Sequence, residues 1–268
     1  MPKIIGICNQ KGGTGKTTTA INIASFLGLT QKKTLIVDMD PQANATSGLG
    51  LEKTKVSLSV YDCLINSIHP REVILESAYP NLFLLPSGLN LSGAEIELVG
   101  LEEREYRLKK SLDLIKEDFD FIIIDAPPSL GLLTLNVLVA SHSIIIPIQC
   151  EYYALEGLSQ LLTTINLVKS NLNPLLEVEG VLLTMADFRT NLTQEVIMEI
   201  RKHFPENSYK TIIPRNIKLA ESPSFGKPVY FYDRNCLGTK SYWKLTEEIL
   251  REPLTIGEKV QDSENQGV

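Results

Sequence analysis

The chain has 268 residues, of which 43% are hydrophobic and 22% charged, and its formal net charge is −6. These values are typical of a globular protein with a sizeable core, and the apolar runs are too short to span a membrane. The acidic balance disfavours tight DNA binding by the whole monomer surface, so a nucleic-acid role would need a local basic patch. Four cysteines without CxxC spacing predict buried or incidental thiols in a cytoplasmic protein.

A glycine-rich turn follows the first predicted strand. The apolar residues 4–8 precede this turn, which occupies residues 10–19, and residues 20–29 have helix-like apolar spacing. A strand, a glycine-rich turn and a helix start form a phosphate cradle, in which successive backbone N–H groups point at one anion. Lys16 is expected to reach the β- and γ-phosphates, and the Thr17 hydroxyl to bind Mg²⁺.

Two further apolar strands end in aspartates. Residues 34–37 lead into Asp38 and Asp40, and residues 119–124 lead into Asp125. Uniformly apolar strands predict a parallel sheet covered on both faces, and such sheets bind ligands at the carboxyl ends of their strands. Asp125 is therefore expected to hold Mg²⁺ or its water, and Asp40 to position the attacking water or hold Mg²⁺ through water. Two acidic residues before a proline could equally form a solvated turn.

The remainder of the chain alternates helical and strand patterns. We expect one or two helices over residues 56–79, strands over 81–85, 144–148 and 178–184, and helices over 92–117, 154–172 and 192–204. This alternation predicts an α/β fold, a doubly wound, mostly parallel sheet with helices on both faces, as in P-loop NTPases. We expect one domain over residues 1–252 and a disordered acidic tail over residues 253–268.

The glycine-rich turn departs from the standard phosphate-binding motif. Gln10 stands where the first glycine is usual, and a second lysine, Lys11, follows it. This arrangement resembles the deviant Walker A motif of the ParA/MinD ATPase family. Further stretches are similar to one branch, the ParA/Soj partition ATPases: residues 37–42, 125–129, 149–157, 183–185, 213–216 and 219–228.

The resemblance implies an ATPase that uses ATP and Mg²⁺ and forms an ATP-dependent homodimer. In that family the extra lysine, here Lys11, crosses the dimer interface and touches the partner's nucleotide, as an arginine finger does. Without the resemblance, Lys11 could equally be a solvated loop lysine. Asp40 would be the aspartate needed for hydrolysis. The implied nucleotide contacts are Lys11, Gly12, Gly13, Thr14, Gly15, Lys16, Thr17, Thr18, Asp125, Met185, Pro214, Arg215 and Asn216.

Arg189 and Lys218 occupy positions at which relatives place DNA-contacting basic residues. The resemblance therefore implies non-specific binding of double-stranded DNA, nucleoid association, and hydrolysis stimulated by a ParB-type centromere-binding protein. Composition alone fits a solvated mixed face equally well, because seven basic and five acidic residues lie between Met185 and Lys227. The alternative is a MinD-like ATPase on a membrane surface, which would need a basic amphipathic C-terminal helix. The acidic residues after Arg251 do not supply one, so we expect no membrane partner.

Overall fold

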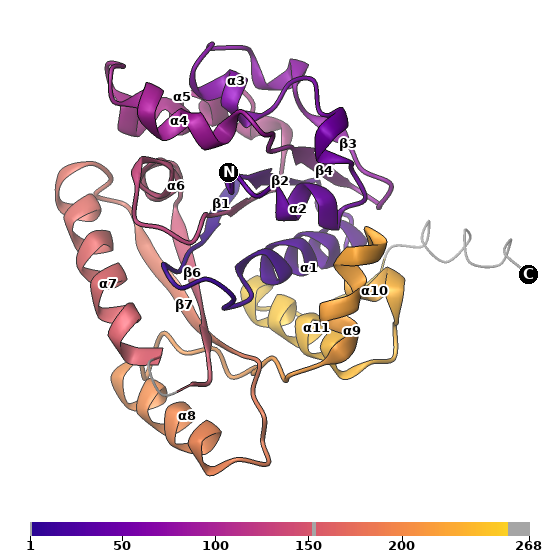
Figure 1. Ribbon diagram of the computed structural model, residues 1–268. Helices are drawn as coiled ribbons and strands as arrows, with labels where there is room; N and C mark the ends of the chain where they lie inside the picture. The colour runs from indigo at the N-terminus through magenta and orange to yellow at the C-terminus, as the bar shows by residue number, and fades with distance from the viewer. Residues whose placement is uncertain (1, 152–153, 257–268) are drawn as a thin grey trace, which may run out of the picture.

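The computed structural model describes residues 2–151 and 154–256. Within these residues a seven-stranded sheet has the order β3-β4-β2-β5-β1-β6-β7 (Figure 1). Its strands are β1 (Lys3–Ile7), β2 (Thr34–Asp38), β3 (Leu75–Glu76), β4 (Leu82–Leu85), β5 (Phe121–Asp125), β6 (Ser143–Gln149) and β7 (Glu177–Thr184). All neighbours pair in parallel except β3 with β4. The predicted doubly wound, mostly parallel sheet is confirmed.

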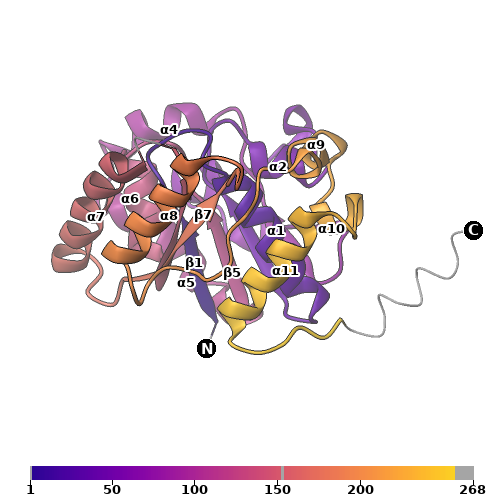
Figure 2. The ribbon, with the colours of Figure 1, turned by 90° about the horizontal axis from the view of Figure 1, so that it is seen from below.

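Helices cover both faces of this sheet. They are α1 (Lys16–Leu29), α2 (Asn44–Gly48), α3 (Val60–Leu64), α4 (Leu91–Leu98), α5 (Arg107–Asp113), α6 (Leu132–Ala140), α7 (Ala154–Asn171), α8 (Asn191–His203), α9 (Ile217–Glu221), α10 (Val229–Tyr232) and α11 (Leu237–Leu250). One core packs α3 to α8 against the sheet, and a second core packs α1 and α9 to α11 against the opposite face. Figure 2 shows α7 and α8 on one side of the strands and α1 and α11 on the other.

The central strands supply both cores in alternation. Ile122 and Ile124 belong to the first core, and Ile123, between them, belongs to the second. Successive side chains of a strand point to opposite faces, so a strand covered on both faces must be apolar at every position. This requirement explains the unbroken apolar runs in the sequence.

The predicted helix over residues 92–117 is wrong. The structure has two shorter helices, α4 and α5, joined by a turn in which Glu103 has a φ of 49°. That left-handed conformation cannot continue a helix. Ile96 and Val99, which the periodicity placed on the buried side, are 80% and 60% exposed. A helical face that looks continuous in the sequence is therefore divided by the turn.

The C-terminal segment closes the second core. Tyr242, Leu245 and Ile249 of α11 are buried against α1, and Leu254 and Ile256 pack partly buried against the same core. Residues 257–268, most of the expected acidic tail, lie outside the described residues. Among the helices that the structure describes, none is long and apolar enough to cross a membrane.

Candidate nucleotide-binding site

The glycine-rich turn connects β1 to α1 at the carboxyl end of a central strand. Gly13 and Gly15 have φ values of 74° and 86°, in the left-handed region that favours glycine. Gly15 is also the N-cap residue of α1, and no side chain caps this helix. Because the N–H groups of a helix's first turn have no partner within the helix, they can bind an anion.

Neighbouring strands hold the turn in place. The Asn9 side chain donates to the carbonyl oxygen of Pro147 at 2.7 Å and accepts from the Lys11 N–H at 3.0 Å. The Thr184 hydroxyl donates to the carbonyl oxygen of Thr14 at 2.8 Å. Pro147 belongs to β6 and Thr184 to β7. The sheet therefore fixes the backbone of the turn before any ligand binds, which reduces the entropy lost on binding.

Lys16 points back over the turn from the start of α1. It is 6% exposed, and its Nζ donates to the carbonyl oxygen of Lys11 at 3.1 Å. Burial lowers the pKa of Lys16, while the nearby Asp125 carboxylate raises it. A buried ammonium with one neutral acceptor gains more partners when a phosphate group arrives.

Asp125, the last residue of β5, is fully buried. Among the described residues, neither of its carboxylate oxygens has a hydrogen-bond partner. Burial raises the pKa of Asp125 well above its ordinary value, and the charge of Asp38 raises it further. The Thr17 hydroxyl lies close enough to oppose that rise, but it does not reach hydrogen-bond geometry. Oxygen ligands without protein donors suit Mg²⁺, so the carboxylate of Asp125 and the hydroxyl of Thr17 fit a magnesium site.

Asp38 lies directly beside Asp125 in the pairing of β2 with β5. It accepts hydrogen bonds from the Asp40 N–H at 3.1 Å, the Thr46 N–H at 2.8 Å and the Thr46 hydroxyl at 2.7 Å. Burial raises the pKa of Asp38 to about 6. Asp38 therefore anchors α2 to β2, a role that the sequence analysis missed. The available signal was its place as the final residue of a wholly buried strand.

Asp40 begins the turn between β2 and α2 and is 6% exposed. Its Oδ1 accepts from the Gln42 N–H at 2.9 Å, and its carbonyl oxygen accepts from the Ser87 hydroxyl at 2.8 Å. Its charge acts on the pKa values of both Lys16 and Asp125, so the structure brings these three side chains to one end of the sheet. No described residue donates to Asp40 Oδ2, which leaves that oxygen for a water molecule.

A cavity of about 200 Å³ adjoins the start of α1. Its lining includes Gly15, Thr18, Met185, Pro214, Arg215 and Asn216, all of which the sequence analysis had placed at the nucleotide. A β-bridge between Ala186 and Pro214 brings the two distant segments together. The cavity therefore adjoins the glycine-rich turn at Gly15.

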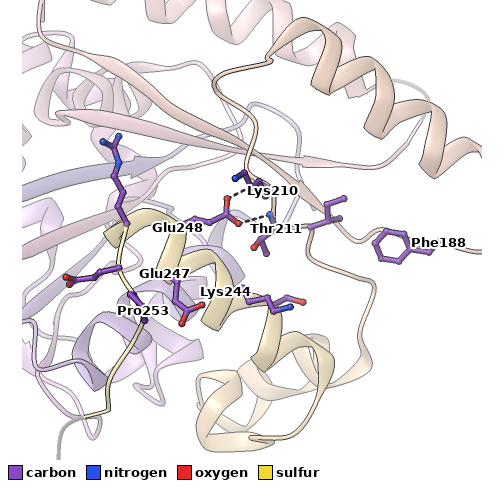
Figure 3. Close-up of a pocket in the computed structure, with 11 residues that line it drawn as sticks. Phe188, Lys210, Thr211, Lys244, Glu247, Glu248 and Pro253 are labelled. Atoms are coloured by element: carbon purple, nitrogen blue, oxygen red, sulfur yellow. Dashed lines mark hydrogen bonds between the residues drawn. The ribbon is translucent and has the colours of Figure 1, made fainter.

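A second cavity, of about 830 Å³, has no residue of this turn in its lining. Figure 3 shows the residues that line it. The cavity lies between α11 and the segment at Lys210 and Thr211, whose N–H groups donate to the Glu248 carboxylate at 2.8 and 2.7 Å. Lys244 and Glu247 add charges of opposite sign to its lining. Of these two cavities, the smaller one is lined by Gly15 and Thr18, at the start of α1, and the larger one is not.

Three other predicted residues are basic and at least partly exposed. Lys11 Nζ forms an ion pair with Glu151 Oε2 at 2.9 Å, and both side chains are nearly half exposed. Arg189 lies in the turn before α8 with its side chain 88% exposed. Lys218 lies in α9 with its side chain 43% exposed. Within a single chain, therefore, Lys11 does not complete the phosphate site.

Sequence comparison identifies relatives of the whole chain. A family described as AAA domain matches residues 2–178. The chain is 54% identical over 249 residues to the sporulation initiation inhibitor protein Soj of Bacillus subtilis, covering 93% of this chain and 98% of Soj. It is 50% identical over 250 residues to the chromosome-partitioning ATPase Soj of Treponema pallidum, covering 93% and 98%.

The chain belongs to the ParA/Soj family of partition ATPases. This confirms the resemblance inferred from the deviant Walker A motif. Among solved structures, a cobyrinic acid a,c-diamide synthase from Mycobacterium smegmatis with bound ADP and magnesium superposes with a TM-score of 0.81. It is 33% identical, and the match covers 96% of this chain and 100% of that one. The partition-ATPase fold is thus shared with nucleotide-binding relatives.

Proposed function

We propose that the chain binds ATP with Mg²⁺, hydrolyses it, and uses the cycle to partition DNA. The observation that carries the proposal is the Asp125 carboxylate, which is fully buried beside the phosphate turn and accepts no hydrogen bond from the described residues. Such a group is costly in a domain that never binds a cation. The family membership and the relatives' bound ADP and magnesium support the same nucleotide chemistry.

Each residue of the site has a separable task in this reaction. The N–H groups around Gly15 bind the phosphates, and Lys16 neutralises charge on the β- and γ-phosphates. Thr17 and Asp125 would hold Mg²⁺, which when bound neutralises charge that develops on the phosphate oxygens. Asp40 Oδ2 accepts a hydrogen bond from the attacking water and orients it.

Lys11 completes the site in a second protomer. Its ion pair with Glu151 joins two half-exposed groups, and such pairs contribute only about 0–1 kcal/mol. The pair therefore breaks readily when a triphosphate in a partner chain offers a stronger anion. We infer an ATP-dependent homodimer in which two copies enclose two nucleotides face to face.

The dimer would bind double-stranded DNA without sequence preference through Arg189 and Lys218. The high exposure of the Arg189 guanidinium supports a phosphate contact, and two copies on one duplex act together. Hydrolysis, stimulated by a ParB-type partner, would release the DNA. We place this cycle on the nucleoid in the cytoplasm.

Three measurements test the proposal. Phosphate release should be abolished in Asp40→Ala and Lys16→Ala but retained in Lys109→Ala, which removes an exposed ammonium paired with Asp113. Sedimentation should show a dimer with a non-hydrolysable ATP analogue and Mg²⁺, and a monomer with ADP. Gel shifts should show DNA binding with ATP only. A protein that stays monomeric with the analogue would refute the dimer, and normal hydrolysis by Asp40→Ala would refute the role of Asp40.

A further inference from the structure

A carboxylate two residues earlier holds the guanidinium of Arg189. Arg189 Nε donates to Asp187 Oδ1 at 2.8 Å, and Arg189 Nη2 donates to Asp187 Oδ2 at 2.6 Å. This is the two-pronged geometry that a guanidinium also uses to bind a phosphate. Asp187 and a DNA phosphate would therefore compete for the same two donors.

Lys218 has a carboxylate partner of the same kind. Its Nζ donates to Glu221 Oε2 at 3.1 Å and lies 5.4 Å from the centroid of the Tyr232 ring. The Tyr232 hydroxyl donates to the same Glu221 oxygen at 2.9 Å, which fixes the carboxylate beside the ammonium. Both basic residues that we propose as DNA contacts are thus paired with an acidic side chain.

We propose that Asp187 and Glu221 are internal competitors of DNA, which weaken the contact of each protomer with a duplex and so make DNA binding depend more strongly on the dimer. The inference rests on the proposed function, because it needs Arg189 and Lys218 to contact phosphates. When the contact of one protomer with DNA is weak, measurable affinity requires both protomers to bind the same duplex. The second, linked contact then adds more to the affinity than either weak contact provides alone. DNA binding then follows the ATP-dependent dimer rather than the monomer.

Asp187 also stabilises the turn before α8, and a test variant must keep this structural role. Its Oδ1 also accepts from the Arg189 N–H at 3.1 Å, and its carbonyl oxygen accepts from the Thr190 N–H and hydroxyl, both at 3.1 Å. Thr190 in turn caps α8. Asp187→Asn keeps an acceptor oxygen for the turn but removes the charge. Glu221→Gln likewise keeps an oxygen for the Tyr232 hydroxyl.

The size of the effect follows from the exposure of the pair. An exposed ion pair changes an equilibrium by roughly 1.4- to 5-fold. Because both copies of the dimer contact one duplex, the factors multiply to about 2- to 25-fold per dimer. We expect Asp187→Asn to tighten the Kd for duplex DNA by this factor with ATP at low salt. Added salt should reduce the gain, since it screens exposed charges.

The matched control is Glu199→Gln, which makes the same charge change on α8. Glu199 is partly exposed and lies 4.0 Å from Lys202 and 3.4 Å from His203, neither of which is a proposed DNA contact. If Asp187 acts on Arg189 directly, Glu199→Gln should give a clearly smaller gain. In an Arg189→Ala background, Asp187→Asn should give no gain at all.

The experiment is a fluorescence-anisotropy titration of a 30-base-pair duplex with full-length protein, ATP and Mg²⁺, and phosphate release is measured without DNA. Tighter binding by Asp187→Asn and by Glu221→Gln, with unchanged DNA-free hydrolysis, supports the inference. Equal affinities of Asp187→Asn and wild type overturn it, as does a gain matched by Glu199→Gln or kept in Arg189→Ala. A wild-type dimer that binds no duplex would instead overturn the proposed DNA role, and with it the inference.

Discussion

The two buried aspartates that end β2 and β5 should respond in opposite directions to replacement by asparagine. Asp38 and Asp125 lie side by side in the sheet, and both are fully buried. Asp38 accepts three hydrogen bonds, whereas Asp125 accepts none from the described residues. In nucleotide-free protein, Asp125→Asn should therefore raise the free energy of unfolding, and Asp38→Asn should lower it.

The magnitudes follow from the partners of each group. Burial has the largest effect on the pKa of Asp125 and the charge of Asp38 raises it further, whereas the Thr17 hydroxyl and the Lys16 charge oppose the rise with smaller effects. Replacing the buried carboxylate by a neutral amide therefore removes a larger desolvation cost than the attraction it loses. The net gain in the free energy of unfolding is limited to about 1–3 kcal/mol, because the amide still lacks a hydrogen-bond partner. For this chain length that gain corresponds to about 2–10 °C in Tm. Asp38→Asn should lower the free energy of unfolding by about 1–3 kcal/mol. Its amide N–H₂ would face the Asp40 N–H, and two donors cannot form the hydrogen bond that the carboxylate accepts.

The pH dependence gives the prediction a second test. An acid whose pKa is raised in the folded state holds its proton more tightly there than in the unfolded chain. Stability from such a group is present at low pH and is lost as pH rises through the folded pKa. The advantage of Asp125→Asn over wild type should therefore grow with rising pH.

The assay is urea unfolding followed by circular dichroism, at pH 5 and pH 8, in EDTA without nucleotide. Repeating it with Mg²⁺ and a non-hydrolysable ATP analogue should stabilise the wild type and leave Asp125→Asn with a much smaller gain. The reasoning is refuted if Asp125→Asn is less stable than wild type in EDTA, or if its advantage shrinks at the higher pH.

Three further predictions concern the same site and its support. Lys16→Ala should lose the thermal stabilisation by nucleotide, measured as the shift in Tm with ATP analogue, and an unchanged shift would exclude the proposed phosphate contact. EDTA should weaken ADP binding by wild type in calorimetry but have little effect on Asp125→Asn; an equal effect on both would remove Asp125 from the metal site. Gly226→Ala should destabilise by at least about 2 kcal/mol, because its φ is 64° and a Cβ would lie 2.5 Å from Gly50 Cα. Gly93→Ala, within α4, is the control and should be neutral or stabilising in urea unfolding, since its Cβ would meet only the Glu97 carboxylate, at 3.3 Å.

Local chemistry in the sequence determined the phosphate turn and the class of fold. Glycines between an apolar strand and a helix leave backbone N–H groups free, and this property depends on neighbouring residues only. The aspartates at the strand ends could also be predicted from the sequence, because unbroken apolar runs mark strands covered on both faces. Periodicity failed over residues 92–117, since a single left-handed residue, Glu103, interrupts a pattern that apolar spacing alone cannot resolve.

Only the tertiary structure decided which charged groups meet. Asp38 and Asp125 are 87 positions apart in the sequence, yet their strands pair in register, and the charge of Asp38 raises the pKa of Asp125. Lys11 meets Glu151 across 140 positions, through the pairing of β1 with β6. Charge interactions depend on distance and burial in space, and neither quantity is written in the local sequence. Even the short-range pair of Asp187 with Arg189 needed the turn before α8 to bring carboxylate and guanidinium face to face.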